Sequence, residues 1–169
     1  MERGLLEDVQ DKYVVVTETK ALVPVFDIEI RTMIYETNRR IIFSRQTPLE
    51  IMKAACLDGG ASMNGRIDYV RDIIGIYQRR PIPVNETEGI YAFPLLSQKD
   101  PANCWIFYSH VRKGLTDKNT GEGIVLFFDG QQLPVTVSSH RLKQQIFKTS
   151  HCKSVCESRV NRRLQYKNT

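Results

Sequence analysis

Glycines and prolines interrupt this chain at short intervals, and they limit what it can fold into more than any other feature. A proline restricts the preceding residue to an extended backbone, and a glycine permits sharp turns that other residues avoid. The apolar runs in the chain, such as YVVVT and IVLFF, are short and rich in β-branched or aromatic residues, which is typical of strands. The pattern therefore predicts many short strands joined by turns.

The strand predictions follow from those runs. Pro24 cannot donate to a ladder, so the run that contains it is predicted as an edge strand. Pro81 and Pro83 make the segment 81–84 extended, whereas residues 69–78 fit either a helix or a strand. The predicted strands are 13–17, 21–26, 32–35, 40–43, 90–96, 105–111, 124–128 and 131–137, with a tight Asp129-Gly130 turn between the last two.

The clearest helix start lies at Thr47. Its side chain caps free backbone amides, Pro48 takes the first helical position, and Glu50 completes a capping box. The pair Gly59-Gly60 ends this helix. Residues 59–66, GGASMNGR, are then predicted as a loop, because three glycines and an asparagine favour turns.

A second helix begins after Ser138 or Ser139, either of which is a suitable cap. Its apolar side chains recur at helical spacing, and the same period continues beyond residue 150; they are Leu142, Ile146, Phe147, Val155 and Val160. Cationic side chains cover the opposite face.

These elements predict an α+β fold in which a mostly antiparallel sheet packs against two or more helices in a single domain. With 169 residues and 41% hydrophobic content, the chain has the size and composition of one soluble domain. We assign the domain to residues 12–150, an N-terminal arm to 1–11 and a basic tail to 151–169. No run approaches the ~20 residues that cross a bilayer, and the N-terminus has no secretory pattern, so we expect a cytoplasmic protein without a membrane partner.

Positive charge is concentrated at the C-terminal end. Residues 141–169 hold eight lysines and arginines against the single acid Glu157, a net charge of +7, whereas the whole chain carries +5. Such asymmetry indicates an anionic partner, of which nucleic acid is the commonest, or a solvated tail.

Catalysis and metal binding have little support. The three histidines His110, His140 and His151 lie in no known nucleophile or metal-hydrolase motif, and no phosphate-binding loop is present. Cys152 and Cys156 with His151 have a spacing that zinc accepts, but no second ligand pair lies nearby. We therefore expect no enzyme activity, no cofactor and no bound metal, and four free thiols in a reducing compartment.

Two modes of nucleic-acid binding remain open. The aromatic side chains of the predicted sheet are able to stack single-stranded bases, as in an RNA-binding protein, or they form the core; they are Tyr91, Phe93, Phe107, Tyr108 and Phe127. Alternatively, Asn64-Gly65-Arg66 is suited to enter the narrow minor groove of A·T tracts, or it is an ordinary turn. No helix-turn-helix is predicted.

The order and spacing of several segments resemble one known family. Between Thr47 and Thr149 these segments read TPLEIM, CLDGGASMNGR, RRPIPV, IYAFPLLS, CWIFYSHV, FFDG and SSHRLKQQIFKT. In that order they resemble the competence transcription factor family of Gram-positive bacteria, the ComK-like proteins. The resemblance covers roughly residues 12–149, and the last stretch, HCKSVCESRVNRRLQYKNT, does not look like the family's C-terminal region.

The resemblance implies a transcriptional activator of DNA-uptake and recombination genes. It implies recognition of paired A·T-rich boxes in double-stranded DNA through the minor groove by homodimers that pair on DNA. It also implies RNA polymerase and an adaptor–protease system as partners. The divergent end leads us to expect a truncated copy that binds DNA and activates poorly. A defective fragment that serves only in dimerisation is a third reading.

The candidate DNA-contact residues come from charge and position. One group lies in and after the glycine-rich loop, and the other lies on the basic face of the second helix. They are Asn64, Gly65, Arg66, Arg71, Arg79, Arg80, Arg141, Lys143 and Lys148.

Overall fold

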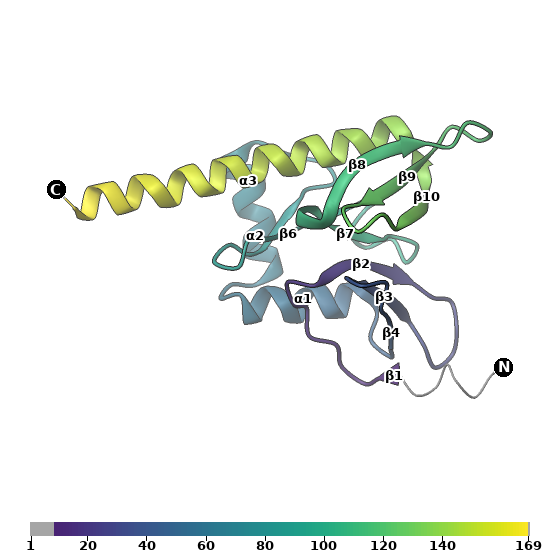
Figure 1. The fold of residues 1–169 in the computed structure, drawn as a ribbon. Coiled ribbons are helices and arrows are strands. Elements are labelled where there is room, and N and C mark those ends of the chain that lie inside the picture. Colours follow the sequence, from purple (N-terminus) through teal and green to yellow (C-terminus); the bar gives the residue numbers. More distant parts are fainter. Residues whose placement is uncertain (1–8, 169) are drawn as a thin grey trace.

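The computed structural model describes residues 9–168, in which ten strands and three α-helices form two sheets with helices around them (Figure 1). The strands are β1 Val9–Gln10, β2 Thr19–Pro24, β3 Thr32–Glu36, β4 Ile41–Ser44, β5 Ile82–Asn85, β6 Ile90–Pro94, β7 Trp105–Phe107, β8 Val111–Thr116, β9 Glu122–Phe127 and β10 Gln132–Ser138. The helices are α1 Pro48–Asp58, α2 Met63–Tyr69 and α3 Ser139–Lys167, with a π-helical turn η1 Val70–Ile74 and a 3₁₀ turn η2 Tyr108–His110.

The larger sheet has seven strands in the order β1-β4-β3-β2-β7-β6-β5, and the smaller has three in the order β10-β9-β8. Only the β1–β4 pair is parallel among the described strands. The predicted α+β class, with a mostly antiparallel sheet and helices in one domain, is confirmed.

The larger sheet separates two hydrophobic cores. Side chains alternate across a strand, so neighbouring residues face opposite cores. Leu22 and Trp105 belong to the core that α1 covers, whereas Ala21 and Ile106 belong to the core shared with the smaller sheet and the first turns of α3. The small sheet and α3 therefore cover one face of the large sheet, and α1 with α2 covers the other (Figure 1).

The local helix and turn signals are confirmed. Thr47 caps α1 through the amide of Glu50, whose carboxylate accepts from the amide of Thr47 in return. Ser138 caps α3 by accepting from the amide of Arg141. Gly130, with φ of 86°, occupies the turn between β9 and β10.

Three strand predictions are wrong, and one of them is the strand 105–111, which the 3₁₀ turn η2 divides between β7 and β8. Residues 13–17 form no ladder, because the amides of Tyr13 and Val16 donate to the side chains of Gln46 and Thr19 and not to a neighbouring strand. Pro24 does not mark an edge strand, since β2 lies inside the large sheet between β3 and β7. The proline is tolerated because it is the last residue of β2, beyond the two residues that pair with β7.

Helical structure covers much of residues 69–78, which fitted either a helix or a strand, and most of the predicted tail from residue 151 onward. Residues 69–74 continue α2 into η1, and Gly75, with φ of 83°, ends the turn. Helix α3 crosses the predicted tail boundary at residue 150 without a break and buries Cys152 and Cys156. Most of the predicted arm, residues 1–8, lies outside the described residues. Within residues 9–168, no helix combines the length and the apolar character needed to cross a membrane.

Candidate nucleic-acid interface

A group of cationic side chains lies where the segment before β5 meets α3. Gln145 of α3, which is buried, donates its amide to the carbonyl oxygens of Arg79 (2.8 Å) and Pro94 (2.7 Å), and Lys148 Nζ donates to Gln78 O (3.2 Å). These bonds hold residues 78–79 against the helix. The basic cluster, as we name it, consists of Arg79, Arg80, Lys99, Arg141 and Lys148.

Three of the five cluster residues line one open cavity of about 480 Å³. Arg79, Arg80 and Lys99 share this cavity with Tyr77, Gln78, Ser97 and Gln98, and no carboxylate lines it. Within residues 9–168, none of the five cluster cations forms an ion pair with an acid. Arg80 lies within electrostatic reach of Asp72, but the cluster as a whole is a positive surface, which is the kind that phosphates neutralise.

The charges of the cluster act on one another. Burial lowers the pKa of Lys148, and the nearby charges of Arg79 and Arg141 lower it further. Like charges raise one another's energy, so an anion that bridges them relieves this repulsion. The lowered pKa of Lys148 thus shows that Arg79 and Arg141 lie within electrostatic reach of its ammonium group.

Arg79 has two further unusual features. Its φ of 44° lies in the left-handed region, which is uncommon for a residue with a side chain and costs on the order of 1–3 kcal/mol. Its Nε is buried and has no hydrogen-bond partner. The hydrogen bond from Gln145 to its carbonyl oxygen keeps the backbone in this conformation.

The glycine-rich loop predicted at 59–66 is present only at residues 59–62. Ser62 accepts from the amide of Gly65 and caps α2, which begins at Met63, so Asn64 and Gly65 are helical and exposed. The sequence Ser-Met-Asn-Gly is a workable helix start, but the glycine obscured it, because glycine is a poor helix former.

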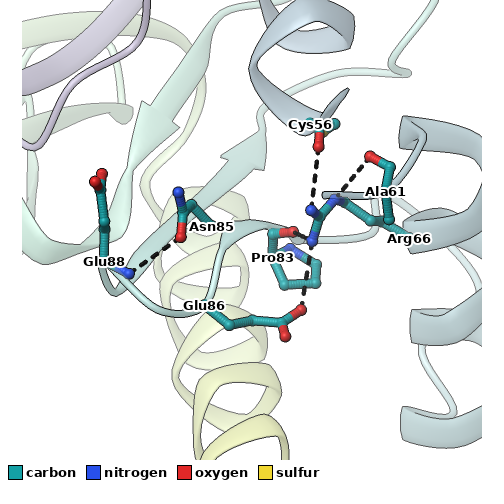
Figure 2. A network of polar contacts seen from close by, with 7 residues as sticks. All are labelled: Cys56, Ala61, Arg66, Pro83, Asn85, Glu86 and Glu88. Atoms are coloured by element: carbon teal, nitrogen blue, oxygen red, sulfur yellow. Dashed lines mark hydrogen bonds and ion pairs between the residues drawn. The ribbon is translucent and has the colours of Figure 1, made fainter. Parts of the chain in front are cut away.

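Arg66 does not face solvent, and its predicted exposed position is wrong (Figure 2). The side chain is 6% exposed, and its guanidinium donates to three carbonyl oxygens: Ala61 (3.3 Å), Pro83 (2.6 Å) and Cys56 (3.1 Å). It also pairs with Glu86 at 3.4 Å. A guanidinium has five donors in a fixed fork, and here they join α1, α2 and β5. Arg66 therefore joins the helices to the sheet and is too buried to enter a groove.

Gly59 is needed beside this network for a steric reason. A Cβ at position 59 would lie 2.2 Å from Val84 O and 3.0 Å from an Arg66 nitrogen, although the φ of −76° is ordinary. We expect Gly59→Ala to lower the free energy of unfolding by about 1–3 kcal/mol, because either the end of α1 or β5 must move. Urea unfolding followed by circular dichroism measures this.

Gly60→Ala is the control for Gly59→Ala. Gly60 has a φ of 106°, and an added Cβ would meet nothing within 4 Å, so its cost is torsional only. If Gly59→Ala proved as stable as wild type, the close packing of α1 against β5 would be contradicted.

The remaining predicted contact residues lie apart from the basic cluster. Arg71 pairs with Asp68 (3.3 Å) and Asp72 (2.8 Å), which offset its charge. Lys143 is exposed on α3 and lies beside Gly114 of β8. The structure thus groups Arg79, Arg80, Arg141 and Lys148 of the nine predicted residues.

Sequence reasoning missed two members of this site. Lys99 lies in the loop after β6 and reaches the cluster only through the fold, so no local signal marks it. Gln145 lies on the apolar stripe of α3, one turn before Thr149, and a polar residue in such a stripe is a usable signal of a buried hydrogen bond.

The aromatic stacking surface is not available in this structure. Tyr91, Phe93, Phe107 and Phe127 are at most 2% exposed and belong to the cores, and only Tyr108 is half-buried. Because stacking needs exposed ring faces, this sheet offers no platform for single-stranded bases. Within residues 9–168, no group of three or more histidine, cysteine or acidic side chains is arranged to hold a metal.

The fold and the cluster define an α+β protein with a cationic surface where residues 79–80 and Lys99 meet its longest helix. Comparison with known proteins then places it: the chain belongs to the ComK protein family, whose model matches residues 10–161. This match extends beyond Thr149, where the resemblance of the segments ended, and it includes all nine predicted contact residues.

One similar curated protein is the competence transcription factor of Bacillus subtilis (strain 168). It is 26% identical over 125 residues, which cover 73% of this chain and 64% of that protein. The chain therefore matches somewhat less than two thirds of the length of its curated relative. No solved structure matches the chain significantly.

Proposed function

We propose that this protein is a DNA-binding regulator of transcription that acts on competence genes. Its family membership and the similarity to a protein named as a competence transcription factor support the regulatory role. The basic cluster supports the contact with DNA, because it gathers five cations, none of which is in an ion pair among the described residues. That cluster is the observation on which the proposed interface rests.

The dimensions of the cluster suit a phosphate backbone. Arg141 and Lys148 lie seven residues apart on α3, which is about 10 Å along a helix axis. Phosphates of one strand rise about 3.4 Å per nucleotide along the duplex axis, so a helix laid along that axis would place the two side chains roughly three nucleotides apart. Arg79 lies near Lys148 and adds a third positive charge.

The finer features of the function rest on the family resemblance. We propose that the protein recognises A·T-rich boxes through the minor groove and pairs as a homodimer on DNA, and that RNA polymerase and an adaptor–protease system are its partners. Asn64, Gly65, Arg71 and Lys143 remain proposed as additional contacts, since all four are at least partly exposed. Phosphate contacts by the cluster set affinity and register, and base contacts elsewhere set the sequence preference.

The decisive experiment replaces the cluster and measures affinity for a duplex. We expect the combined variant Arg79→Gln, Arg141→Gln, Lys148→Gln to bind A·T-rich duplex about 10–100-fold more weakly at fixed salt. The slope of log affinity against log salt should also become shallower by roughly 2–3, because each phosphate contact contributes about 0.9. Fluorescence anisotropy across a salt series gives both quantities.

A matched variant controls for net charge. Arg31, Lys53 and Arg112 are exposed and lie outside the basic cluster, so their combined change to glutamine removes the same charge elsewhere. Thermal melting shows whether each variant is folded. The proposed interface is contradicted if the matched variant loses as much affinity as the cluster variant. Preference for single strands over duplex would favour the alternative nucleic-acid binder.

A further inference from the structure

A second cavity lies between the end of β2, the start of α1 and the loop that joins β6 to β7. Its volume is about 340 Å³. Cavities that bind small molecules have volumes of about 300–1,000 Å³, so this one suits a small ligand. Its apolar lining includes Pro24, Pro48, Leu49 and Trp105, of which Pro48 and Trp105 are buried. Prolines and a tryptophan have few rotatable bonds, so the apolar surface that they present is rigid.

Hydrogen bonds hold each of the three walls in place. At the turn between β2 and β3, the Asp27 carboxylate accepts from the amides of Glu29 (2.8 Å) and Ile30 (3.2 Å). At the start of α1, Thr47 forms the capping box. In the loop between β6 and β7, the Asp100 carboxylate accepts from the amide two residues later at 2.9 Å. The cavity is therefore formed before anything binds, and a ligand does not have to order the chain around it.

One polar side chain in the lining has a donor without a partner. Asn103 is 3% exposed, and its Oδ1 accepts from the amides of Leu95 and Leu96, both at 2.9 Å. These two bonds fix the orientation of the side-chain amide, because a flipped amide would turn its nitrogen toward two donors. Nδ2, the other arm of the amide, is buried and has no hydrogen-bond partner among the described residues. Since buried polar groups are paired with few exceptions, this donor is available to an acceptor on a bound molecule.

The charged side chains of the cavity balance one another. The lining holds two cations and two carboxylates, all exposed; they are Arg31, Lys99, Asp27 and Asp100. Within residues 9–168, neither cation forms an ion pair. Because the formal charges sum to zero, the cavity does not concentrate ions of either sign. Its charge therefore suits a neutral molecule.

We propose that this cavity binds a small neutral molecule that carries an apolar ring and a carbonyl group. The ring packs against Pro48, Leu49 and Trp105, and the carbonyl oxygen accepts from Asn103 Nδ2. Asn103 and Trp105 stand two residues apart at the entry to β7, where alternate side chains share a face, so one small molecule is able to contact both. The proposal does not depend on DNA binding, although Lys99 lines this cavity as well as the cavity beside the basic cluster.

The test uses three soluble probes that share one benzene ring. Phenylacetamide is neutral and has a carbonyl acceptor, phenylacetate has a charged acceptor, and phenethylamine has no acceptor. We expect phenylacetamide to bind with a dissociation constant on the order of 1 mM, which is usual for so small a ligand. Phenethylamine should bind about tenfold more weakly because it leaves Nδ2 unpaired. Phenylacetate should also bind more weakly, because its charge must leave water.

Two measurements follow the binding. Trp105 is the only tryptophan of the chain, so its fluorescence reports what enters the cavity. The nuclear magnetic resonance signal of the Asn103 side-chain amide should shift with phenylacetamide and stay in place with phenethylamine. Equal affinities for phenylacetamide and phenethylamine, or an unchanged Asn103 signal when phenylacetamide binds, would overturn the proposed hydrogen bond.

Variants at two positions complete the test. Asn103→Asp keeps the acceptor oxygen and replaces Nδ2 by oxygen, so it should weaken phenylacetamide binding about tenfold. Asn85→Asp is its control, because Asn85 Oδ1 also accepts from a backbone amide but lies outside the cavity. Leu49→Trp should fill the cavity and abolish binding of all three probes, which tests the site even if Asn103→Asp does not fold. Thermal melting shows which variants are folded. Full affinity for phenylacetamide in folded Leu49→Trp protein would place its binding elsewhere and overturn the site.

Discussion

Replacing Arg66 by alanine is expected to lower the free energy of unfolding by about 3–5 kcal/mol, with no specific change in DNA sequence preference. The guanidinium donates to the carbonyl oxygens of Cys56, Ala61 and Pro83, which belong to different segments, and it is 6% exposed (Figure 2). Alanine leaves these carbonyls without that donor and leaves a cavity between α1, α2 and β5. For a domain of this size, the melting temperature should fall by about 10 °C or more.

Two companion variants separate the hydrogen-bond network from the charge. Arg66→Lys keeps the positive charge but has one nitrogen in place of the guanidinium fork, so we expect an intermediate loss of stability. Arg71→Ala removes an exposed arginine a short distance along the same helical segment and should change stability by less than about 0.5 kcal/mol. A stable Arg66→Ala protein with relaxed preference for A·T boxes would restore the minor-groove role and refute the structural one.

The parts of the fold that were predicted depend on neighbours close in sequence. The capping box of α1 needs only Thr47 and Glu50, three residues apart, and the β9–β10 turn needs only Asp129 and Gly130. The cap of α3 at Ser138 is local in the same way. Sequence patterns report such contacts because the partners and the conformation lie within one short segment.

Most of the wrong predictions depend on distant partners, whereas the missed start of α2 is local and was obscured by Gly65. Residues 13–17 have the composition of a strand, but Tyr13 gives its amide to Gln46, far along the chain. Its hydroxyl binds Glu36 (2.6 Å), and Thr19 lies 2.7 Å from the same oxygen. The β-branched composition of residues 13–17 could not show that Tyr13 would be buried with these partners. Composition does not specify which distant segment supplies the hydrogen bonds.

The candidate site shows the same division. Arg141 and Lys148 were predicted from the basic face of a helix, which is a local property. The position of Arg79 beside them could not be predicted in this way. It depends on hydrogen bonds from Gln145 and Lys148 to residues 78–79, more than sixty residues earlier in the chain. Arg66 failed as a prediction for a related reason: its partners are backbone carbonyls, which every residue has, so no side-chain pattern marks them.

The second large expected effect on stability concerns the buried ion pair between Lys20 and Asp129, which links the two sheets. Lys20 of β2 is fully buried, and its Nζ binds Asp129 (2.5 Å) and Gln131 in the β9–β10 turn and lies 4.9 Å from the centre of the Phe127 ring. Removing one partner of a buried ion pair leaves the other charge uncompensated. We expect Asp129→Ala to cost about 2–4 kcal/mol, toward the low side of the usual range because a quarter of the Asp129 side chain is exposed.

The same contact predicts a dependence on pH. Burial raises the pKa of Asp129, but the hydrogen bond from Lys20, the amide of Gln131 and the charge of Lys20 outweigh it, so the pKa is lowered on folding. A lowered pKa in the folded state means that the unfolded chain binds the proton more tightly. The stabilisation is therefore present above the ordinary carboxyl pKa of about 3.9 and is lost as the pH falls through the folded value.

Urea unfolding of wild type and Asp129→Asn between pH 7 and pH 2.5 checks this sign. The stability difference between the two proteins should be largest at neutral pH and should shrink below about pH 4, because both then carry an uncharged group at position 129. Asp58→Asn, at the exposed end of α1, is the matched change for which we expect little difference at neutral pH. A difference between wild type and Asp129→Asn that stayed constant down to pH 2.5 would show that the pKa of Asp129 does not change on folding, and the charge of Asp129 would then contribute nothing to joining the sheets.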